Sequence, residues 1–303
     1  MTAVMGLGLA ALGRPGYLTL GHGESIGADR SVDGLQQRCH EVCDAAWAAG
    51  IRWFDAARSY GRAEEFLASW LTRRAIGPAE VTVSSKWGYT YTADWKVDVE
   101  VPEVKDHSAA ALARQWPESD ALLGPWLRLY QVHSATLDSG ILTDTRVHRD
   151  LAGLGVPIGL SVSGPLQAET LRRALPIEVE GVPLFSAVQA TWNLLETSVG
   201  AALAEAKAAG WTIIVKEALA NGRLAEPGRA PALLGARPDV TALAAAVHQP
   251  WADVVLSGAA TVAHLWSNVA ALTESTGQDL DGLSSLARDP RDYWAERGAL
   301  RWT

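Results

Sequence analysis

One rhythm along the chain constrains its fold more than any other feature: a short apolar run, a polar loop and then a longer segment with helical periodicity. We count eight such runs in 303 residues. They are rich in Val, Ile, Leu and aromatic residues, as parallel strands covered on both faces require. The runs that we predict as strands are 4–9, 51–55, 81–86, 127–133, 157–161, 186–191, 212–216 and 254–257. Helical periodicity with one apolar face marks residues 32–49, 62–76, 145–154, 166–175, 197–209 and 261–274.

Eight alternating units in a chain of this length fit a closed barrel better than an open sheet. We therefore predict the α/β class and a (β/α)8 TIM barrel, with residues 1–303 as a single domain because no linker divides them. Residues 87–108 are too long for an ordinary connection and follow the third strand, so we expect a lid or a substrate loop. The tail 278–303 is polar but carries Tyr293, Trp294 and Trp302, so we expect it to pack over the barrel.

Composition excludes several classes of function. Lys and Arg total 26 against 34 Asp and Glu, a net charge of −8, and no basic run occurs, so nucleic acid is not an expected partner. No apolar stretch reaches the roughly 20 residues that span a bilayer, and the N-terminal apolar segment lacks a basic start, so neither membrane insertion nor secretion is expected. Cys39 and Cys43 share an apolar helix face, which argues against a disulfide framework and a metal site. We expect a cytoplasmic protein with a small-molecule substrate and an oligomeric state that the sequence leaves open.

Four polar residues follow the predicted strands at the barrel end where catalytic groups gather. Asp55 ends the second strand, Tyr60 follows five residues later, Lys86 ends the third strand and His133 ends the fourth. A phenol with a pKa near 10 delivers a proton to a carbonyl oxygen only when it is made more acidic, and a neighbouring ammonium has that effect. We expect Lys86 to act on Tyr60 in this way, Asp55 to hold Lys86, and His133 to orient the substrate oxygen or relay the proton.

In this order and spacing the four residues resemble the catalytic tetrad of the aldo-keto reductases. The likeness extends to Met5-Gly6-Leu7-Gly8, Leu129-Tyr130-Gln131-Val132-His133, Gly159-Leu160-Ser161 and Ser257-Gly258-Ala259. It implies an NAD(P)H-dependent oxidoreductase that transfers a hydride between the cofactor and a carbonyl or alcohol substrate, such as an aldehyde, a ketone or a sugar. NADP(H) is the family's usual cofactor, with NAD(H) as the alternative.

The resemblance also implies a set of cofactor-binding residues. Ser161 and Gln189 match the positions that hold the nicotinamide carboxamide, and Val162 stands where Asn is common. Lys216 stands where the family commonly has an aromatic residue that stacks on the nicotinamide. The remaining matched positions are Leu219 and Gly222 near the pyrophosphate and Gly258, Ala259, Thr261, His264 and Asn268 at the adenosine end. That end lacks the Lys or Arg typical of members that prefer the phosphorylated dinucleotide, which keeps NADH as an alternative.

Other residues near the predicted mouth carry weaker signals. We expect Trp87 and Trp192 to line a substrate pocket, and His22 and His107 to be solvated loop residues. The glycines at positions 6 and 8 resemble a dinucleotide fingerprint, but Pro15 and Gly16 prevent the helix that the fingerprint requires.

Two rival functions stay open at this stage. A barrel hydrolase with two carboxylates would use Asp55 and Glu217, and it predicts turnover without a nucleotide. A non-catalytic barrel that binds a nicotinamide nucleotide would show binding with slow or absent hydride transfer.

Overall fold

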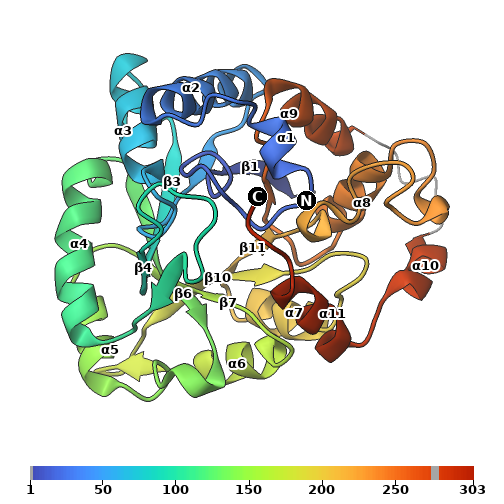
Figure 1. The fold of residues 1–303 in the computed structure, drawn as a ribbon. Helices are drawn as coiled ribbons and strands as arrows, with labels where there is room; N and C mark the ends of the chain where they lie inside the picture. Colours follow the sequence, from blue (N-terminus) through green and yellow to red (C-terminus); the bar gives the residue numbers. More distant parts are fainter. Residues whose placement is uncertain (1–2, 274–279) are drawn as a thin grey trace.

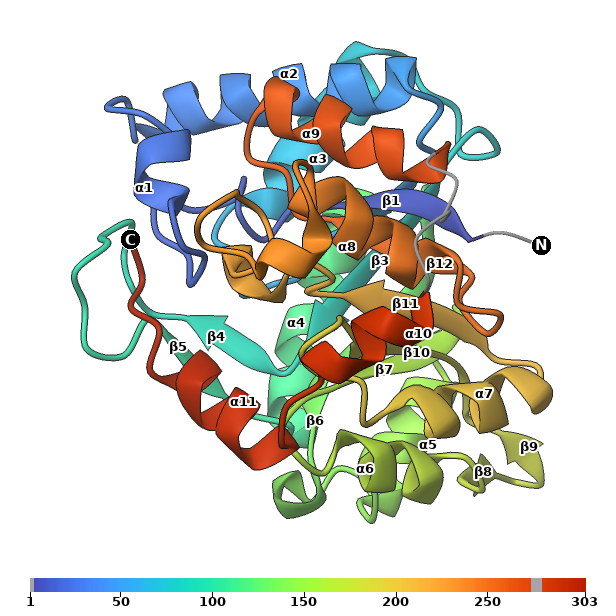
Figure 2. The same ribbon diagram turned by 90° about the vertical axis from the view of Figure 1, so that its right-hand side faces the viewer.

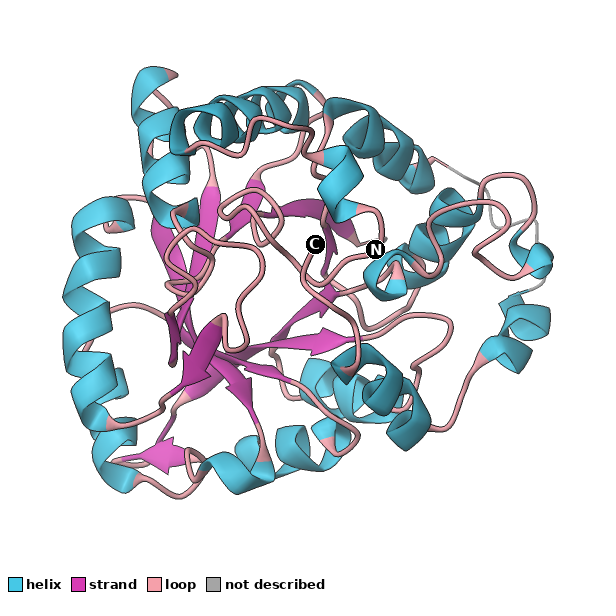
Figure 3. Cartoon of the chain, viewed as in Figure 1, coloured by secondary structure: helices cyan, strands magenta, loops and turns pink. Residues whose placement is uncertain are grey.

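In the computed structural model, which describes residues 3–273 and 280–303, parallel strands close into a barrel inside a ring of helices (Figures 1 and 3). Neighbouring strands follow one another in chain order, and β1 pairs with both β2 and β12 to close the barrel. The (β/α)8 prediction is therefore confirmed, with each of the eight strands within two residues of its predicted bounds. The strands are β1 (Val4–Gly8), β2 (Trp53–Asp55), β3 (Thr82–Trp87), β6 (Leu127–Ala135), β7 (Ile158–Val162), β10 (Phe185–Thr191), β11 (Thr212–Lys216) and β12 (Val254–Ser257).

The helices pack on the outside of the barrel and include all six that periodicity predicts. They are α2 (Val32–Ala48), α3 (Ala63–Arg73), α4 (Ala109–Leu123), α5 (Thr145–Ala152), α6 (Gln167–Ala174), α7 (Gly200–Ala208), α8 (Pro238–Val247) and α9 (Val262–Val269). The predicted end of the last helix, Glu274, lies outside the described residues. Helices α4 and α8 were not predicted: α4 contains Pro117, and α8 is buried along most of its length, so it lacks a polar face that would reveal its period.

Helix α2 shows how the sequence specifies one of these elements. The Ser31 side chain caps its first turn by accepting a hydrogen bond from the backbone N–H of Gly34. Its apolar face, which includes Leu35, Cys39 and Cys43, is fully buried against the barrel. The two cysteines are therefore packing residues of this interface.

The lower half of the barrel interior is apolar and tightly packed, with Leu129, Ile214, Val254 and Leu256 in one cluster. A Cβ atom at Gly6 would come within 2.8 Å of the Leu256 side chain, so β1 needs glycine where it faces this cluster. Gly6 therefore serves barrel packing, as expected from the rejection of a dinucleotide fingerprint. Polar side chains replace the apolar ones towards the C-terminal ends of the strands.

Irregular segments gather at that polar end of the barrel (Figure 2). The long loop after β3 forms a hairpin from β4 (Tyr89–Tyr91) and β5 (Glu103–Lys105), and a short helix, α1 (His22–Ser25), follows β1. The tail contains α10 (Leu280–Leu283) and α11 (Pro290–Gly298), and its last residue pairs with Tyr17 through two backbone hydrogen bonds between Tyr17 and Thr303. Away from this end, β8 (Glu178–Val179) and β9 (Val182–Pro183) form a second small hairpin. Within residues 3–273 and 280–303, none of the helices has the length and apolar character needed to span a bilayer.

Candidate active site

A buried ion pair lies at the C-terminal ends of β2 and β3. The Lys86 Nζ atom is 2.5 Å from Oδ2 of Asp55 and donates a second hydrogen bond, of 2.8 Å, to the carbonyl oxygen of Ala56. The Lys86 and Asp55 side chains are 0% and 2% exposed. Burial lowers the pKa of Lys86, and the Asp55 carboxylate opposes that shift. Because Nζ is 4.7 Å from the centre of the Tyr60 ring, three of the four predicted catalytic residues lie together.

The other carboxylate oxygen of Asp55 accepts hydrogen bonds from residues of β3 and of two further strands. Its Oδ1 atom accepts hydrogen bonds from Ser84 Oγ (2.7 Å), Gln189 Nε2 (3.0 Å) and Gln131 Nε2 (3.3 Å). These donors come from β3, β10 and β6, so hydrogen bonds from three strands fix the position of the Asp55 carboxyl group. Gln189, which we expected at the nicotinamide carboxamide, lines the cavity but directs its amide nitrogen to Asp55.

Tyr60 lies on a tight turn after β2. The next residue, Gly61, has φ +61°, and a Cβ atom there would come within 2.4 Å of the carbonyl oxygen of Gly13. The Tyr60 ring meets His133 edge-on at 5.4 Å between ring centres, and the Arg14 guanidinium carbon lies 5.2 Å from the Tyr60 ring centre. The phenol therefore stands between a cation and an imidazole.

The Tyr60 phenol is less acidic in this structure than the expected effect of Lys86 alone would make it. Burial is the largest cause that raises the pKa of Tyr60 well above its usual value, the charge of Asp55 adds to it, and Arg14 opposes it. The phenol is therefore protonated at neutral pH.

His133 completes the group and is uncharged. Burial lowers the pKa of His133 well below its usual value, and the positive charges of Lys86, Lys216 and Arg14 lower it further. Ser59 Oγ lies 3.4 Å from its Nδ1 atom. A neutral imidazole retains one N–H donor, which suits a group that holds a substrate oxygen.

Two hydrogen bonds fix the backbone around His133. His107 Nε2 donates to the carbonyl oxygen of His133 (2.8 Å), and the N–H of Ser134 donates to Ser161 Oγ (2.7 Å). Ser134 has φ +52°, and the pairing of β6 with β7 shifts register between Val132 and Ala135, so the strand bends at the histidine.

These contacts correct two predictions. His107 is 8% exposed, and burial lowers its pKa to about 4, so it is not a solvated loop residue. His22 is 2% exposed and lines the cavity, and burial lowers its pKa to about 4 as well. Ser161, expected to contact the nicotinamide, is fully buried and does not line the cavity, because its hydroxyl supports the bend after His133.

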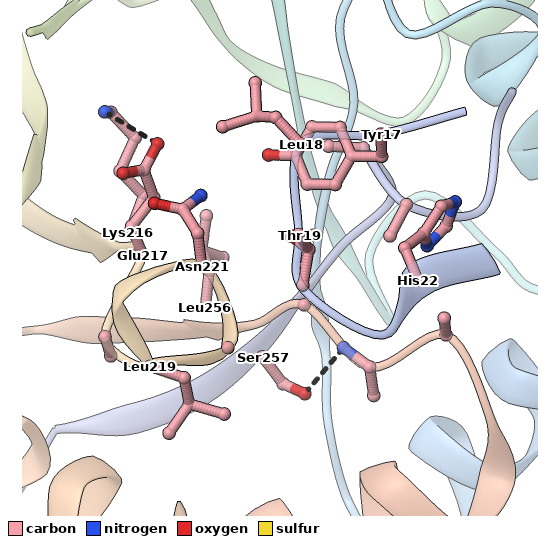
Figure 4. Close-up of a pocket in the computed structure, with 18 of the residues that line it drawn as sticks. Tyr17, Leu18, Thr19, His22, Lys216, Glu217, Leu219, Asn221, Leu256 and Ser257 are labelled. Atoms are coloured by element: carbon pink, nitrogen blue, oxygen red, sulfur yellow. Dashed lines mark hydrogen bonds and ion pairs between the residues drawn. The ribbon is translucent and has the colours of Figure 1, made fainter. Parts of the chain in front are cut away.

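A cavity of about 260 Å³ opens at this end of the barrel and connects most of the predicted residues. Asp55, Tyr60 and His133 line one part of it, while Lys86 lies buried behind them. The residues from the predicted cofactor set that line it are Gln189, Lys216, Leu219, Gly222, Gly258, Ala259, His264 and Asn268. Figure 4 shows Lys216 and Glu217 on one side of the cavity and Tyr17 on the other.

The loop between β12 and α9 forms the other end of the cavity. Asn268 Nδ2 donates to Ser257 Oγ (2.9 Å), and the same hydroxyl oxygen accepts from the N–H of Ala259 (3.3 Å). Thr261 caps α9 by accepting from the N–H of His264, and it does not line the cavity, contrary to expectation. The first turn of α9 thereby starts at the cavity edge.

A charged cluster lies between these two ends. Lys216 Nζ donates to Thr191 Oγ1 (2.7 Å) and is 3.9 Å from Glu217 Oε1, while Arg297 of α11 holds Glu217 with two bonds of 2.8 and 2.5 Å. Burial lowers the pKa of Lys216 to about 8, against the opposing effect of Glu217. Burial raises the pKa of Glu217, but Arg297 and Lys216 outweigh it and bring that pKa to about 2.

Several cavity residues were missed by sequence reasoning. Arg14 is 1% exposed, bonds to Glu103 (3.0 Å) and to the carbonyl oxygen of Ser59 (2.8 Å), and lies 4.2 Å from a Trp302 ring centre. The only sequence signal at Arg14 was the segment Gly13-Arg14-Pro15-Gly16, which indicates a loop. This segment does not indicate that the C-terminal tail packs against Arg14. Arg297 and Tyr17 likewise reach the cavity through contacts between distant segments.

Neither predicted pocket tryptophan lines the cavity, so that expectation is wrong. Trp87 is fully buried against His107, with 5.8 Å between ring centres, and Trp192 packs on Trp251 at 5.7 Å. Successive strand residues point to opposite faces. Since Lys86 faces the barrel interior, Trp87 faces the helices.

Comparisons with known proteins agree with this geometry. The family model for the Aldo/keto reductase family matches residues 36–302, whereas no curated protein matches the chain. A crystal structure from Pseudomonas aeruginosa, of a protein assigned provisionally as an aldo-keto reductase, is 25% identical, with 89% of each chain covered and a TM-score of 0.64. The holo form of aldo-keto reductase AKR11C1 from Bacillus halodurans shares the fold at 18% identity, with 98% of this chain and 92% of that chain covered and a TM-score of 0.63. The chain belongs to the aldo/keto reductase family.

Proposed function

We propose that this oxidoreductase interconverts a carbonyl compound and its alcohol with an NAD(P)H cofactor. The observation that carries the proposal is the protonated Tyr60 phenol, placed in the cavity 5.4 Å, between ring centres, from the neutral His133 ring. A proton donor beside a hydrogen-bond donor is the arrangement that carbonyl reduction needs at the substrate oxygen.

Each residue of the tetrad has a separate role in this proposal. His133 donates a hydrogen bond that holds the substrate oxygen, and Tyr60 gives that oxygen its proton. The Lys86 ammonium, 4.7 Å from the Tyr60 ring centre, stabilises the phenolate that remains, and Asp55 keeps Lys86 charged and in place. In alcohol oxidation, Tyr60 takes the proton instead.

The residues present fit a nicotinamide dinucleotide. Within the described parts of the chain, Asn221 Oδ1 and His22 Nε2 are buried at the cavity and have no hydrogen-bond partner, as expected of groups that await a ligand. Gln189 and Lys216 would hold the nicotinamide half, and the remaining cavity residues of the predicted set, Leu219, Gly222, Gly258, Ala259, His264 and Asn268, would hold the pyrophosphate and adenosine. A bound reduced nicotinamide would supply the hydride.

The charge distribution bears on the choice between NADP(H) and NAD(H). Of the described cavity residues, the three with cationic Lys or Arg side chains, Arg14, Lys216 and Arg297, belong to the tetrad end and its charged cluster. Asp239 lines the cavity and bonds to Ser267 of α9, which adds a carboxylate near the other end. NADP(H) therefore remains the family's usual choice, and NADH has to be tested beside it.

The two-carboxylate hydrolase is disfavoured by the site. Glu217 is fixed by Arg297 and its pKa is about 2, so it cannot act as the proton donor that such a hydrolase needs near neutral pH. Asp55 has both oxygens occupied by buried donors.

The test is a pair of measurements on the purified protein. Energy transfer from tryptophan to the bound dihydronicotinamide measures the Kd of NADPH and of NADH, and a single-turnover assay with aldehydes, ketones and sugars measures oxidation of the bound cofactor. Binding with turnover supports the proposal. Binding without turnover of any carbonyl supports the non-catalytic alternative, and turnover of a glycoside without a nucleotide supports the hydrolase.

A further inference from the structure

Among the described cations of the cavity, Lys216 is unusual because no carboxylate lies within hydrogen-bonding distance of it. Arg14 pairs with Glu103 at 3.0 Å, and Arg297 uses both oxygens of Glu217. Lys216 Nζ has the Thr191 hydroxyl at 2.7 Å, but Glu217 Oε1 is 3.9 Å away, beyond hydrogen-bonding distance. The Glu217 carboxylate is thus the nearest countercharge of both Arg297 and Lys216, and the cluster of these three residues carries a net positive charge.

That charge acts on the reacting end of the cavity. The charge of Lys216 helps to lower the pKa of His133, and the charge of Arg297 helps to lower the pKa of Lys216. The positive charge of Lys216 is therefore felt at the tetrad. With its own pKa at about 8, Lys216 is mostly protonated at neutral pH. The Lys216 side chain is 15% exposed, so water screens its charge only in part.

The position of Lys216 relative to the tetrad gives this charge a consequence, which rests on the proposed function. Hydride transfer requires the nicotinamide to lie in near contact with the carbon whose oxygen meets Tyr60 and His133. The ring is neutral in the reduced cofactor and positively charged in the oxidised one. We infer that Lys216 weakens binding of the oxidised cofactor relative to the reduced one, so that the site discriminates between the two redox states by charge.

This discrimination favours release of the oxidised cofactor, which is the product of carbonyl reduction. An oxidised cofactor that is repelled by Lys216 leaves the site more readily after a carbonyl has been reduced. A neutral side chain at position 216 would remove the discrimination without removing the tetrad, because Lys216 makes no hydrogen bond to any of its four members among the described contacts.

The test measures affinities and needs no turnover. Isothermal titration calorimetry at pH 7 gives the Kd of NADPH, NADP⁺, NADH and NAD⁺ for the wild type, Lys216→Met, Lys216→Gln and Lys216→Arg. We expect Lys216→Met and Lys216→Gln to lower the ratio of oxidised to reduced Kd about tenfold, as one charge without a hydrogen-bonded carboxylate in a partly buried site would produce. Lys216→Arg keeps the charge and should keep the ratio.

Lys207→Met is the matched control, because Lys207 lies on α7 with its side chain 41% exposed and does not line the cavity. It should leave all the affinities unchanged. If neutralising Lys216 changes the Kd of the oxidised and the reduced cofactor equally, the inference is overturned. It is also overturned if the ratio of the two Kd values is unchanged while the KM for an anionic substrate rises, because Lys216 would then be a substrate contact. Failure of the folded wild type to bind any of the four dinucleotides would instead remove the proposed function, so the two failures are distinct.

Discussion

Gln189 Nε2 lies 3.0 Å from Oδ1 of Asp55, which joins a residue of the predicted cofactor set to a residue of the tetrad across the barrel interior. The bond connects β10 to β2, strands that are not neighbours in the barrel. A ligand that draws the Gln189 amide away therefore changes the environment of Asp55, and through it that of Lys86. If the cofactor binds at Gln189 as proposed, this hydrogen bond would couple its binding to the tetrad.

Tyr60→Phe removes only the phenolic oxygen of the proposed proton donor. We expect kcat to fall by about 10² to 10⁴, the usual contribution of a general acid, with the Kd of the cofactor unchanged. Single-turnover kinetics and fluorescence titration measure the two quantities separately. Tyr91→Phe in the hairpin is the control and should retain the wild-type rate. A Tyr60→Phe enzyme with most of its activity would show that another group supplies the proton.

Lys86→Met should destabilise the fold as well as abolish turnover. It leaves the Asp55 carboxylate buried with its main countercharge removed, a change that costs about 3–5 kcal/mol in comparable buried pairs. Urea unfolding followed by circular dichroism measures the loss. Arg172→Met breaks an exposed ion pair with Glu205 and should barely move the unfolding midpoint. Equal midpoints for the two variants would show that the Asp55–Lys86 pair contributes little to folding.

The sequence predicts the barrel and the tetrad for one shared reason. Each strand is a compact apolar run, and Asp55, Lys86 and His133 each stand at or next to the end of one, so the fold class implies that they meet. It does not predict which way the next residue faces, and Trp87 was placed wrongly because strand alternation turns it away from Lys86. Arg14 and Arg297 were missed because they reach the cavity through loops and the tail, whose contacts leave no periodic signal.

The pKa shifts of the site residues could not be predicted for the same reason, because they also depend on contacts between distant segments. That Tyr60 is kept protonated depends on its burial and on the charge of Asp55 near it, and neither can be read from residue order. Residue types indicate which groups interact, while the sign of the pKa shift of Tyr60 depends on which interaction is stronger.

The Glu217–Arg297 pair should make stability depend on acid pH. The pKa of Glu217 is about 2 in the folded chain, below its usual 4.5, so its stabilisation is fully present above pH 4.5 and is lost as the pH falls through 2. The size of the effect is about 3 kcal/mol between these limits. Urea midpoints measured from pH 6 to pH 2 give the slope. Glu217→Gln should flatten it, whereas Glu169→Gln on the exposed side of α6 should not. Equal slopes for all three proteins would assign the acid sensitivity to other carboxylates.

A cation at the α9 end of the cavity should change the preference between dinucleotides. His264 lines the cavity beside the first turn of α9, and Arg at this position would offer the 2′-phosphate of NADPH a bidentate, charge-assisted contact. We expect His264→Arg to tighten NADPH relative to NADH about tenfold, in line with a hydrogen bond to a charged group. Val262→Arg is the control because Val262 is on the same helix, 38% exposed and outside the cavity lining. The ratio of the two Kd values at low and high salt is the measurement, since a contact to the phosphate weakens as salt screens it. An unchanged ratio in His264→Arg would place the adenosine ribose away from α9 and would require a different path for the dinucleotide through the cavity.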